Sequence, residues 1–307
     1  MTASIIQPGE IQPAGVEAPF IRLPDNDVFS RRSERFDFLA QGHAMTDYLQ
    51  FMAHIAAAQH TALSAMGALS LPEAEQLNLC RQHGMPPLTA QSWPRDRNWQ
   101  LALLHIVSTV QGAARQATRS ALERLAKADS SWLEAQAGHL LAGRYEQLDL
   151  AAAPFVGAAL QVYWVAMATA LGESAFGRTD NPTLCPVCAS APVASVVRIG
   201  GEEQGLRYLH CSLCETEWHM VRVKCSSCES TKGIAYFSVE GSSGAVKAET
   251  CDECHSYLKI MYMERDHLVD PVADDLATLA LDILLDEKGY MRSGPNLLLI
   301  PAGDSPT

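Results

Sequence analysis

Through most of the N-terminal half of the chain, apolar residues recur at every third or fourth position, which is the spacing of one face of an α-helix. The longest such run predicts a single amphipathic helix over roughly 44–69. A second helical pattern extends from about 97 to 127, either as one helix or with a break near Gly112. Ser131 with Glu134 has the pattern of a capping box at the start of a further helix. These patterns predict an α-helical bundle.

One stretch of this region, residues 150–171, contains no charged residue and is long enough to cross a bilayer. It contains Pro154 and Gln161, however, and its flanks are the acidic residues Asp149 and Glu173, where a membrane span usually has basic ones. We therefore expect a buried central helix of the bundle and no stable membrane insertion.

The pattern changes after a linker at 177–182. Short runs that alternate apolar and polar residues and are rich in β-branched side chains predict four strands, at 193–199, 207–210, 233–239 and 246–249. Asp270 and Pro271 then have the pattern of a helix start, and Gly289 follows its expected end. We expect one face of this helix to carry its apolar residues, Val272, Leu276, Leu279, Ala280, Ile283 and Leu284.

Composition and charge narrow the class of protein. With 48% hydrophobic and 19% charged residues, the chain is typical of a folded soluble protein, and 307 residues allow roughly two domains. The net charge of −12 argues against a nucleic-acid partner. The N-terminus lacks the pattern of a secretory signal, which favours a cytoplasmic protein. The common nucleophile, phosphate-loop, zinc-protease and dinucleotide motifs are missing from the sequence, so we do not expect an enzyme.

Eight of the nine cysteines form four C-x-x-C pairs, and corresponding cysteines lie 40 residues apart, so one unit is used twice. Two such turns brought together make a tetrahedral four-thiolate site for Zn or a single Fe. We expect two sites, made by Cys185, Cys188, Cys211 and Cys214 and by Cys225, Cys228, Cys251 and Cys254. Disulfides are disfavoured because nothing in the sequence points to an oxidising compartment. The ninth cysteine, Cys80, is expected to be a small buried apolar residue.

Together these features predict an α+β protein. A helical domain at 1–180 begins with an extended arm, over residues 1–30, that wraps either a partner or its own domain. Two tandem rubredoxin-like or zinc-ribbon metal modules follow at 183–223 and 224–265. Residues 266–307 supply a C-terminal helix that packs on the bundle or on the last metal module, and a tail in which residues 297–300 form a strand or an apolar docking segment.

The spacing of the cysteines does not choose between iron and zinc. A single Fe on four thiolates can change its oxidation state without changing its ligands, whereas Zn cannot. Rubredoxin-type turns commonly have Gly after the second cysteine, where this chain has Ala189, Glu215, Glu229 and His255. His210, which directly precedes a cysteine, is expected to support the site or lie on the surface instead of binding metal.

Three longer motifs are more specific than the spacing. They are Cys211-Ser-Leu-Cys-Glu-Thr-Glu-Trp-His219, Val221-Arg-Val-Lys-Cys-Ser-Ser-Cys228, and Asp270-Pro-Val-Ala-Asp-Asp-Leu-Ala-Thr-Leu-Ala280 with Gly289-Tyr290 after it. They resemble the FdhE family of formate dehydrogenase accessory proteins. The resemblance extends into the helical half through Arg31-Arg32 and Gly84-Met-Pro-Pro87, and all eight paired cysteines match the family pattern.

The resemblance implies a cytoplasmic, non-catalytic assembly factor that is required for active respiratory formate dehydrogenase and binds the immature catalytic subunit of that molybdenum enzyme. It also implies that all eight paired cysteines are metal ligands, and it favours iron, with zinc as the alternative, because family members look rubredoxin-like and are described as iron binding. The alternative function is a rubredoxin-like electron-transfer or redox-sensing iron protein. The sequence does not specify the client-binding surface or the oligomeric state.

Overall fold

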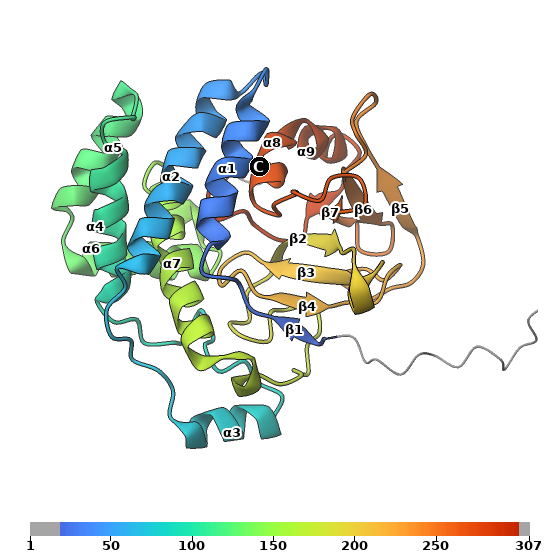
Figure 1. Ribbon diagram of the computed structural model, residues 1–307, viewed down its shortest axis with the longest axis horizontal. Helices are drawn as coiled ribbons and strands as arrows, with labels where there is room; N and C mark the ends of the chain where they lie inside the picture. Colours follow the sequence, from blue (N-terminus) through green and yellow to red (C-terminus); the bar gives the residue numbers. More distant parts are fainter. Residues whose placement is uncertain (1–18, 301–307) are drawn as a thin grey trace, which may run out of the picture.

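The computed structural model describes residues 19–300, which contain nine α-helices and eight strands. Most of the expected N-terminal arm, residues 1–18, lies outside the described residues, as do residues 301–307. The helices of the N-terminal half gather on one side of the molecule and the strands on the other (Figure 1). The expected α+β fold class, with helices first and a strand-rich region after them, is therefore confirmed.

The N-terminal half is helical throughout. Its helices are α1 (Val28–Ala40), α2 (Thr46–Ser64), α3 (Ala74–Gln82), α4 (Asn98–Val110), α5 (Gln116–Lys127), α6 (Ser130–Leu141) and α7 (Ala153–Leu171), with short 3-10 turns at Tyr145–Gln147 and Glu173–Ala175. The expected helical stretch at 97–127 is broken between α4 and α5, where Gly112 stands, so the second of the two expected forms is correct. The capping box was placed wrongly, because the Asp129 side chain accepts the backbone N–H of Trp132 (2.8 Å) and Ser131 lies inside α6.

Helix α7 packs against α2, α4 and α6 within the helical half (Figure 1), and its Gln161 amide donates to Ser212 O of the strand-rich region. It is long and apolar enough to span a membrane, but 78% of its apolar window is buried inside the protein. Its Pro154 stands in the first turn, where no backbone N–H is needed. The uncharged stretch is thus the core helix of the fold, as expected.

The strands form one sheet. They are β1 (Ile21–Arg22), β2 (Pro192–Val197), β3 (Arg207–Cys211), β4 (Glu217–His219), β5 (Ile234–Phe237), β6 (Val246–Cys251), β7 (Ser256–Tyr262) and β8 (Met291–Arg292), in the order β1-β4-β3-β2-β7-β6-β5 with β8 beside β7. A 3-10 turn, Gly201–Glu203, lies between β2 and β3. Because β1 pairs with β4, the described end of the N-terminal arm packs on the chain's own sheet.

Each 40-residue repeat folds into an antiparallel three-stranded meander, β2-β3-β4 in the first repeat and β5-β6-β7 in the second. The meanders join through parallel pairing of β2 with β7, in which Ser195 lies opposite Ile260. A buried ion pair also joins them, with Arg207 Nη2 2.7 Å from Glu249 Oε1. The two repeats therefore share one continuous sheet, and the expected boundaries between modules stay predictions.

The C-terminal helix is two helices, α8 (Ala273–Ala277) and α9 (Leu279–Asp286), which are separated at Thr278. Asp270 Oδ1 accepts the backbone N–H of Val272 (3.0 Å) and of Ala273 (2.7 Å), so the expected helix start is correct. The expected single apolar face is wrong, because the break turns α9 into a new register and Ile283 is 62% exposed.

The two helices pack on different parts of the protein. Val272 and Leu276 join the main core beside α1, whereas Leu281 and Leu285 form a small separate cluster with side chains of β6 and β7. The tail then returns to α7, where Leu297, Leu298 and Ile300 are buried. Residues 297–300 are therefore an apolar docking segment, one of the two expected alternatives.

Candidate metal centres

The four C-x-x-C turns share one backbone conformation. The residue after each second cysteine has a positive φ, which is 60° at Ala189 and Glu215, 62° at Glu229 and 51° at His255. These are the positions where glycine is common in rubredoxin-type turns, and four side-chain-bearing residues adopt the left-handed conformation there. In the first turn, Ala189 N–H donates to Cys185 O (2.9 Å), which closes the loop and directs both sulfurs inward.

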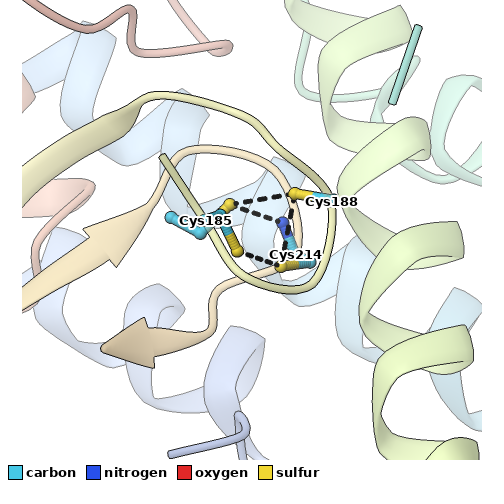
Figure 2. A group of neighbouring side chains, drawn as sticks. Cys185, Cys188 and Cys214 are labelled. Carbon is cyan, nitrogen blue, oxygen red and sulfur yellow. Dashed lines mark hydrogen bonds between the residues drawn. The ribbon is translucent and has the colours of Figure 1, made fainter. Parts of the chain in front are cut away.

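The first group, site 1, consists of Cys185, Cys188, Cys211 and Cys214 (Figure 2). Its Sγ–Sγ separations include 3.5 Å for Cys185–Cys214, 3.4 Å for Cys188–Cys211 and 3.6 Å for Cys188–Cys214. All four side chains are fully buried and belong to the main hydrophobic core. Two backbone N–H groups, of Leu213 and Cys214, donate to Cys211 Sγ and favour a thiolate there.

The second group, site 2, consists of Cys225, Cys228, Cys251 and Cys254, with Sγ–Sγ separations of 3.7 Å for Cys225–Cys254 and Cys228–Cys251. Cys225 and Cys251 are buried, but Cys228 is exposed and Cys254 is half-buried. The Ser256 hydroxyl lies 3.0 Å from Cys254 Sγ. Site 2 therefore repeats the sulfur arrangement of site 1 near the protein surface.

Both sulfur arrangements fit a tetrahedral ion. A Zn–S bond of about 2.3 Å places the sulfurs of a tetrahedral site about 3.8 Å apart, close to the separations at both sites. Burial raises the pKa of Cys185 and of Cys211 well above the usual value of a thiol. At Cys188 burial also acts to raise the pKa, but the hydrogen bonds to the other three cysteines prevail and lower it. Four thiolates packed together in the core would repel one another without a cation beside them, and four soft sulfur donors select Zn or Fe over Mg or Ca.

Site 1 is held in place by the helical half of the protein. Leu88 N–H donates to Val187 O (3.0 Å), and Ala90 N–H donates to Cys188 O (2.8 Å), so the segment after α3 pairs with the first turn. On the other side of the site, the Gln161 amide of α7 donates to Ser212 O (2.9 Å). The core helix and a connecting loop thus fix both turns of site 1.

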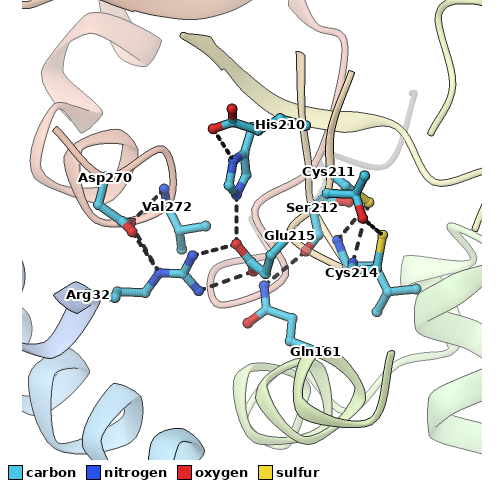
Figure 3. Close-up of polar contacts among 12 residues, drawn as sticks. Arg32, Gln161, His210, Cys211, Ser212, Cys214, Glu215, Asp270 and Val272 are labelled. Carbon is cyan, nitrogen blue, oxygen red and sulfur yellow. Dashed lines mark hydrogen bonds and ion pairs between the residues drawn. The ribbon is translucent and has the colours of Figure 1, made fainter. Parts of the chain in front are cut away.

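Glu215, which directly follows Cys214, is the centre of a buried polar network (Figure 3). Arg32 of α1 donates to both Glu215 oxygens, at 3.1 and 2.5 Å, and its Nε donates to Asp270 Oδ1 at 3.1 Å. The side chains of Arg32 and Glu215 are 0% exposed. The network therefore ties the second turn of site 1 to α1 and to the start of α8.

The same network continues through His210. Its Nε2 lies 2.7 Å from Glu215 Oε2 and its Nδ1 3.4 Å from Glu217 Oε1, so its ring is directed away from the sulfurs. Burial lowers the pKa of His210, but the hydrogen bonds and charges of the two glutamates outweigh burial and raise it to about 9. For Glu215 burial acts in the opposite direction and raises the pKa, because it disfavours the carboxylate. The charges of Arg32 and His210 outweigh burial and hold the pKa of Glu215 below its usual range.

The structure brings together every cysteine that the sequence analysis selected, in the two groups that the repeat predicted. His210 supports the turn, as expected. The pairing of Arg32 with Glu215 was missed, although both residues stand in the family motifs, because a sequence pattern does not show which distant charges meet. Cys80 is buried on α3 and belongs to neither group, in line with the expectation for it.

The fold and the two cysteine groups define a class of protein in which a helical body packs against the first cysteine site of a sheet built mainly from two tetracysteine repeats. Family models match three successive parts of the chain: "FdhE, N-terminal" at 18–179, "FdhE, central domain" at 184–222 and "FdhE, C-terminal domain" at 223–299. The chain belongs to the FdhE family, as its motifs indicated.

Individual relatives agree with the family models. The chain is 44% identical over 309 residues to the "Protein FdhE homolog" of Pseudomonas aeruginosa, covering 99% of this chain and 100% of that protein. It is 41% identical over 276 residues to "Protein FdhE" of Escherichia coli, covering 90% and 89%. The crystal structure of the FdhE protein from Pseudomonas aeruginosa matches with a TM-score of 0.85 at 44% identity, over 93% of this chain and 100% of that one.

Proposed function

We propose that this protein is a cytoplasmic accessory factor that binds the immature catalytic subunit of formate dehydrogenase and is needed for that enzyme to become active. Its eight paired cysteines, in this proposal, hold two metal ions. The observation that carries the metal assignment is the gathering of all eight sulfurs into two groups of tetrahedral spacing. Membership of the FdhE family supports the link to formate dehydrogenase.

The donor sets support a role without catalysis. Four thiolates around one ion leave no coordination position for a substrate, so each metal would act on the fold and not as a Lewis acid. At site 1 the four cysteines, Cys185, Cys188, Cys211 and Cys214, would hold an ion in the hydrophobic core, beside the contacts between the first repeat and the helical body. We propose in addition that the chain is organised as a helical unit at 1–180, metal modules at 183–223 and 224–265, and a C-terminal unit at 266–307.

Complementation tests the proposed function. In a bacterium whose own FdhE homologue has been deleted, the wild-type protein should restore formate dehydrogenase activity and should co-purify with the catalytic subunit. Cys188→Ser at site 1 should abolish both results. Cys80→Ser is the matched control, because it removes a buried thiol that belongs to neither group. Failure of the wild type to restore activity and to bind the subunit would contradict the proposal.

A second candidate function is electron transfer or redox sensing. It requires iron in at least one site, and the family resemblance favours iron over zinc as the metal. The exposure of Cys228 supports it, because an ion at site 2 would lie close enough to the surface to exchange electrons with a partner. Protein purified without oxygen should then show iron absorption that bleaches reversibly on reduction. Colourless protein carrying two zinc ions would exclude this candidate.

A further inference from the structure

A polar pocket lies where the two repeats meet, on the opposite ends of β2 and β7 from the cysteine turns. Its volume is about 190 Å³, well above the roughly 10–15 Å³ that a cavity needs in the same measure to hold one water molecule. The first repeat contributes Arg198, Gln204 and Arg222, and the second contributes Lys247, Tyr262 and Arg265. Gly205 and Gly244 also line it, and because glycine has no side chain, the backbone itself forms the wall of the pocket at these two positions.

The charge of this pocket is opposite to that of the protein. Four cationic side chains and one carboxylate, Glu264, line it, in a chain whose net charge is −12. Among the side chains that the structure describes, no carboxylate forms an ion pair with Arg222, Lys247 or Arg265. Arg222 Nη1 donates only to Gly205 O, at 3.4 Å, and Lys247 Nζ lies 5.4 Å from the centre of the Tyr262 ring.

The fourth cation, Arg198, is already neutralised. Its Nε donates to Glu217 Oε2 at 2.7 Å, so it forms part of the wall. Three cations without an ion pair among the described residues remain around the same space, and Glu264 is the one carboxylate that lines it with them. Like charges that line one pocket repel one another, and a bound anion would reduce that repulsion while accepting hydrogen bonds from their N–H groups. Arg222 and Arg265 are exposed and Lys247 is half-buried, whereas the fully buried cations Arg32 and Arg207 are each paired with a carboxylate.

The repeat explains why the pocket is at this place. Gln204 and Gly244 lie 40 residues apart, as do Arg222 and Tyr262, so the corresponding segments of both repeats face each other across it. Val197 and Tyr262 are partners in the parallel pairing of β2 with β7, and this pairing fixes the distance between the two repeats at the pocket. Val197, Lys247 and Tyr262 belong to the strands β2, β6 and β7, and the other lining residues stand in loops beside the ends of the strands.

We propose that this pocket, named here the inter-repeat pocket, binds a compact oxyanion of diphosphate size, either free or carried on a small molecule. Its volume suits a diphosphate, and its three unpaired cations suit the multiple charges of that group. A long nucleic acid is disfavoured, because only four of the 23 basic residues line the pocket and the protein as a whole has a net charge of −12. The inference is independent of the metals and of the proposed client.

The test is calorimetric titration of the metal-loaded, full-length protein at low ionic strength with pyrophosphate and, separately, with ADP. Saturable binding of pyrophosphate is the expected result, and it should weaken as sodium chloride is added. Tighter binding of ADP would show that the oxyanion is carried on a larger molecule, whereas equal or weaker binding would show that the free anion suffices. Metal content is measured before and after, because pyrophosphate also binds metal ions.

Variants assign the binding to the pocket. Arg222→Gln combined with Lys247→Gln should weaken the affinity by about tenfold or more, since each removes a charged hydrogen-bond donor. The matched control is Arg119→Gln combined with Lys232→Gln, which changes the net charge equally at positions outside the pocket and should leave the affinity unchanged. Arg265→Gln, at an exposed position, gives a second variant that is expected to fold normally. Absence of binding to both ligands, or equal loss in the control, would overturn the proposal.

Discussion

Replacing Arg32 by methionine should strongly destabilise the second turn of site 1. Methionine replaces the aliphatic part of the arginine side chain with one of similar length, but the substitution removes the guanidinium that neutralises Glu215 and Asp270. Glu215 is then left ionised and fully buried, with His210 as its remaining partner. Breaking a buried ion pair by removing one member costs about 3–5 kcal/mol, which is several times the value of an exposed pair.

The neighbouring residue provides a matched control. Arg31 lies one position earlier on the same helix, but its side chain is 56% exposed and its ion pairs with Asp25 and Asp27 are on the surface. Arg31→Met removes the same charge from the same helix and should cost less than about 1 kcal/mol. The contrast between the two variants therefore measures the buried network and not the loss of a positive charge from α1.

Amide hydrogen exchange measured by mass spectrometry reports the effect where it occurs. A loss of 3 kcal/mol should speed exchange in the peptide from Cys211 to His219 by about 150-fold, against about fivefold or less for Arg31→Met. Adding Glu215→Gln to Arg32→Met should recover part of the protection, because the unpaired buried charge is removed as well. Exchange as slow in Arg32→Met as in Arg31→Met would refute the reasoning.

Three further outcomes follow from the same structure. Arg207→Met should lower the free energy of unfolding by about 3–5 kcal/mol in urea titrations, because it leaves Glu249 buried without its counter-charge, and a midpoint equal to wild type would contradict this. Gly157→Ala should expose the C-terminal tail to proteolysis, since an added Cβ would lie 2.4 Å from Leu297 O; an unchanged cleavage pattern would argue against the docking. A chelator should remove the ion at site 2 before the ion at site 1, because only site 2 has an exposed sulfur ligand, Cys228; simultaneous release would oppose that difference.

The parts of the fold that sequence predicted have local signals. The uncharged run of α7 and the C-x-x-C pairs of both sites can be recognised without knowing any distant contact. Strand β7, by contrast, was not predicted, because it lies inside the sheet, is buried on both faces and does not alternate, and it even buries Lys259. Strand β4 has only three residues, which is too short for a periodic pattern.

The parts that sequence missed depend on contacts between distant segments. Arg32 and Glu215 lie 183 positions apart, and a charged residue in isolation is expected on the surface. The break at Thr278 was missed because both halves of the C-terminal helix have a helical pattern, while the core beside α1 and the cluster on β6 and β7 require different faces. The different burial of the two sites was equally hidden, because the repeat makes their cysteines look equivalent.

The most direct test of the central claim is native mass spectrometry of protein purified without oxygen, with a visible absorption spectrum of the same sample. The account predicts two metal ions per chain. It also predicts one ion in a variant that carries Cys188→Ser and Cys214→Ser, one in a variant that carries Cys228→Ser and Cys254→Ser, and two in Cys80→Ser. Wild-type protein that folds without metal, or serine variants that keep both ions, would contradict the assignment of the eight cysteines to two metal sites.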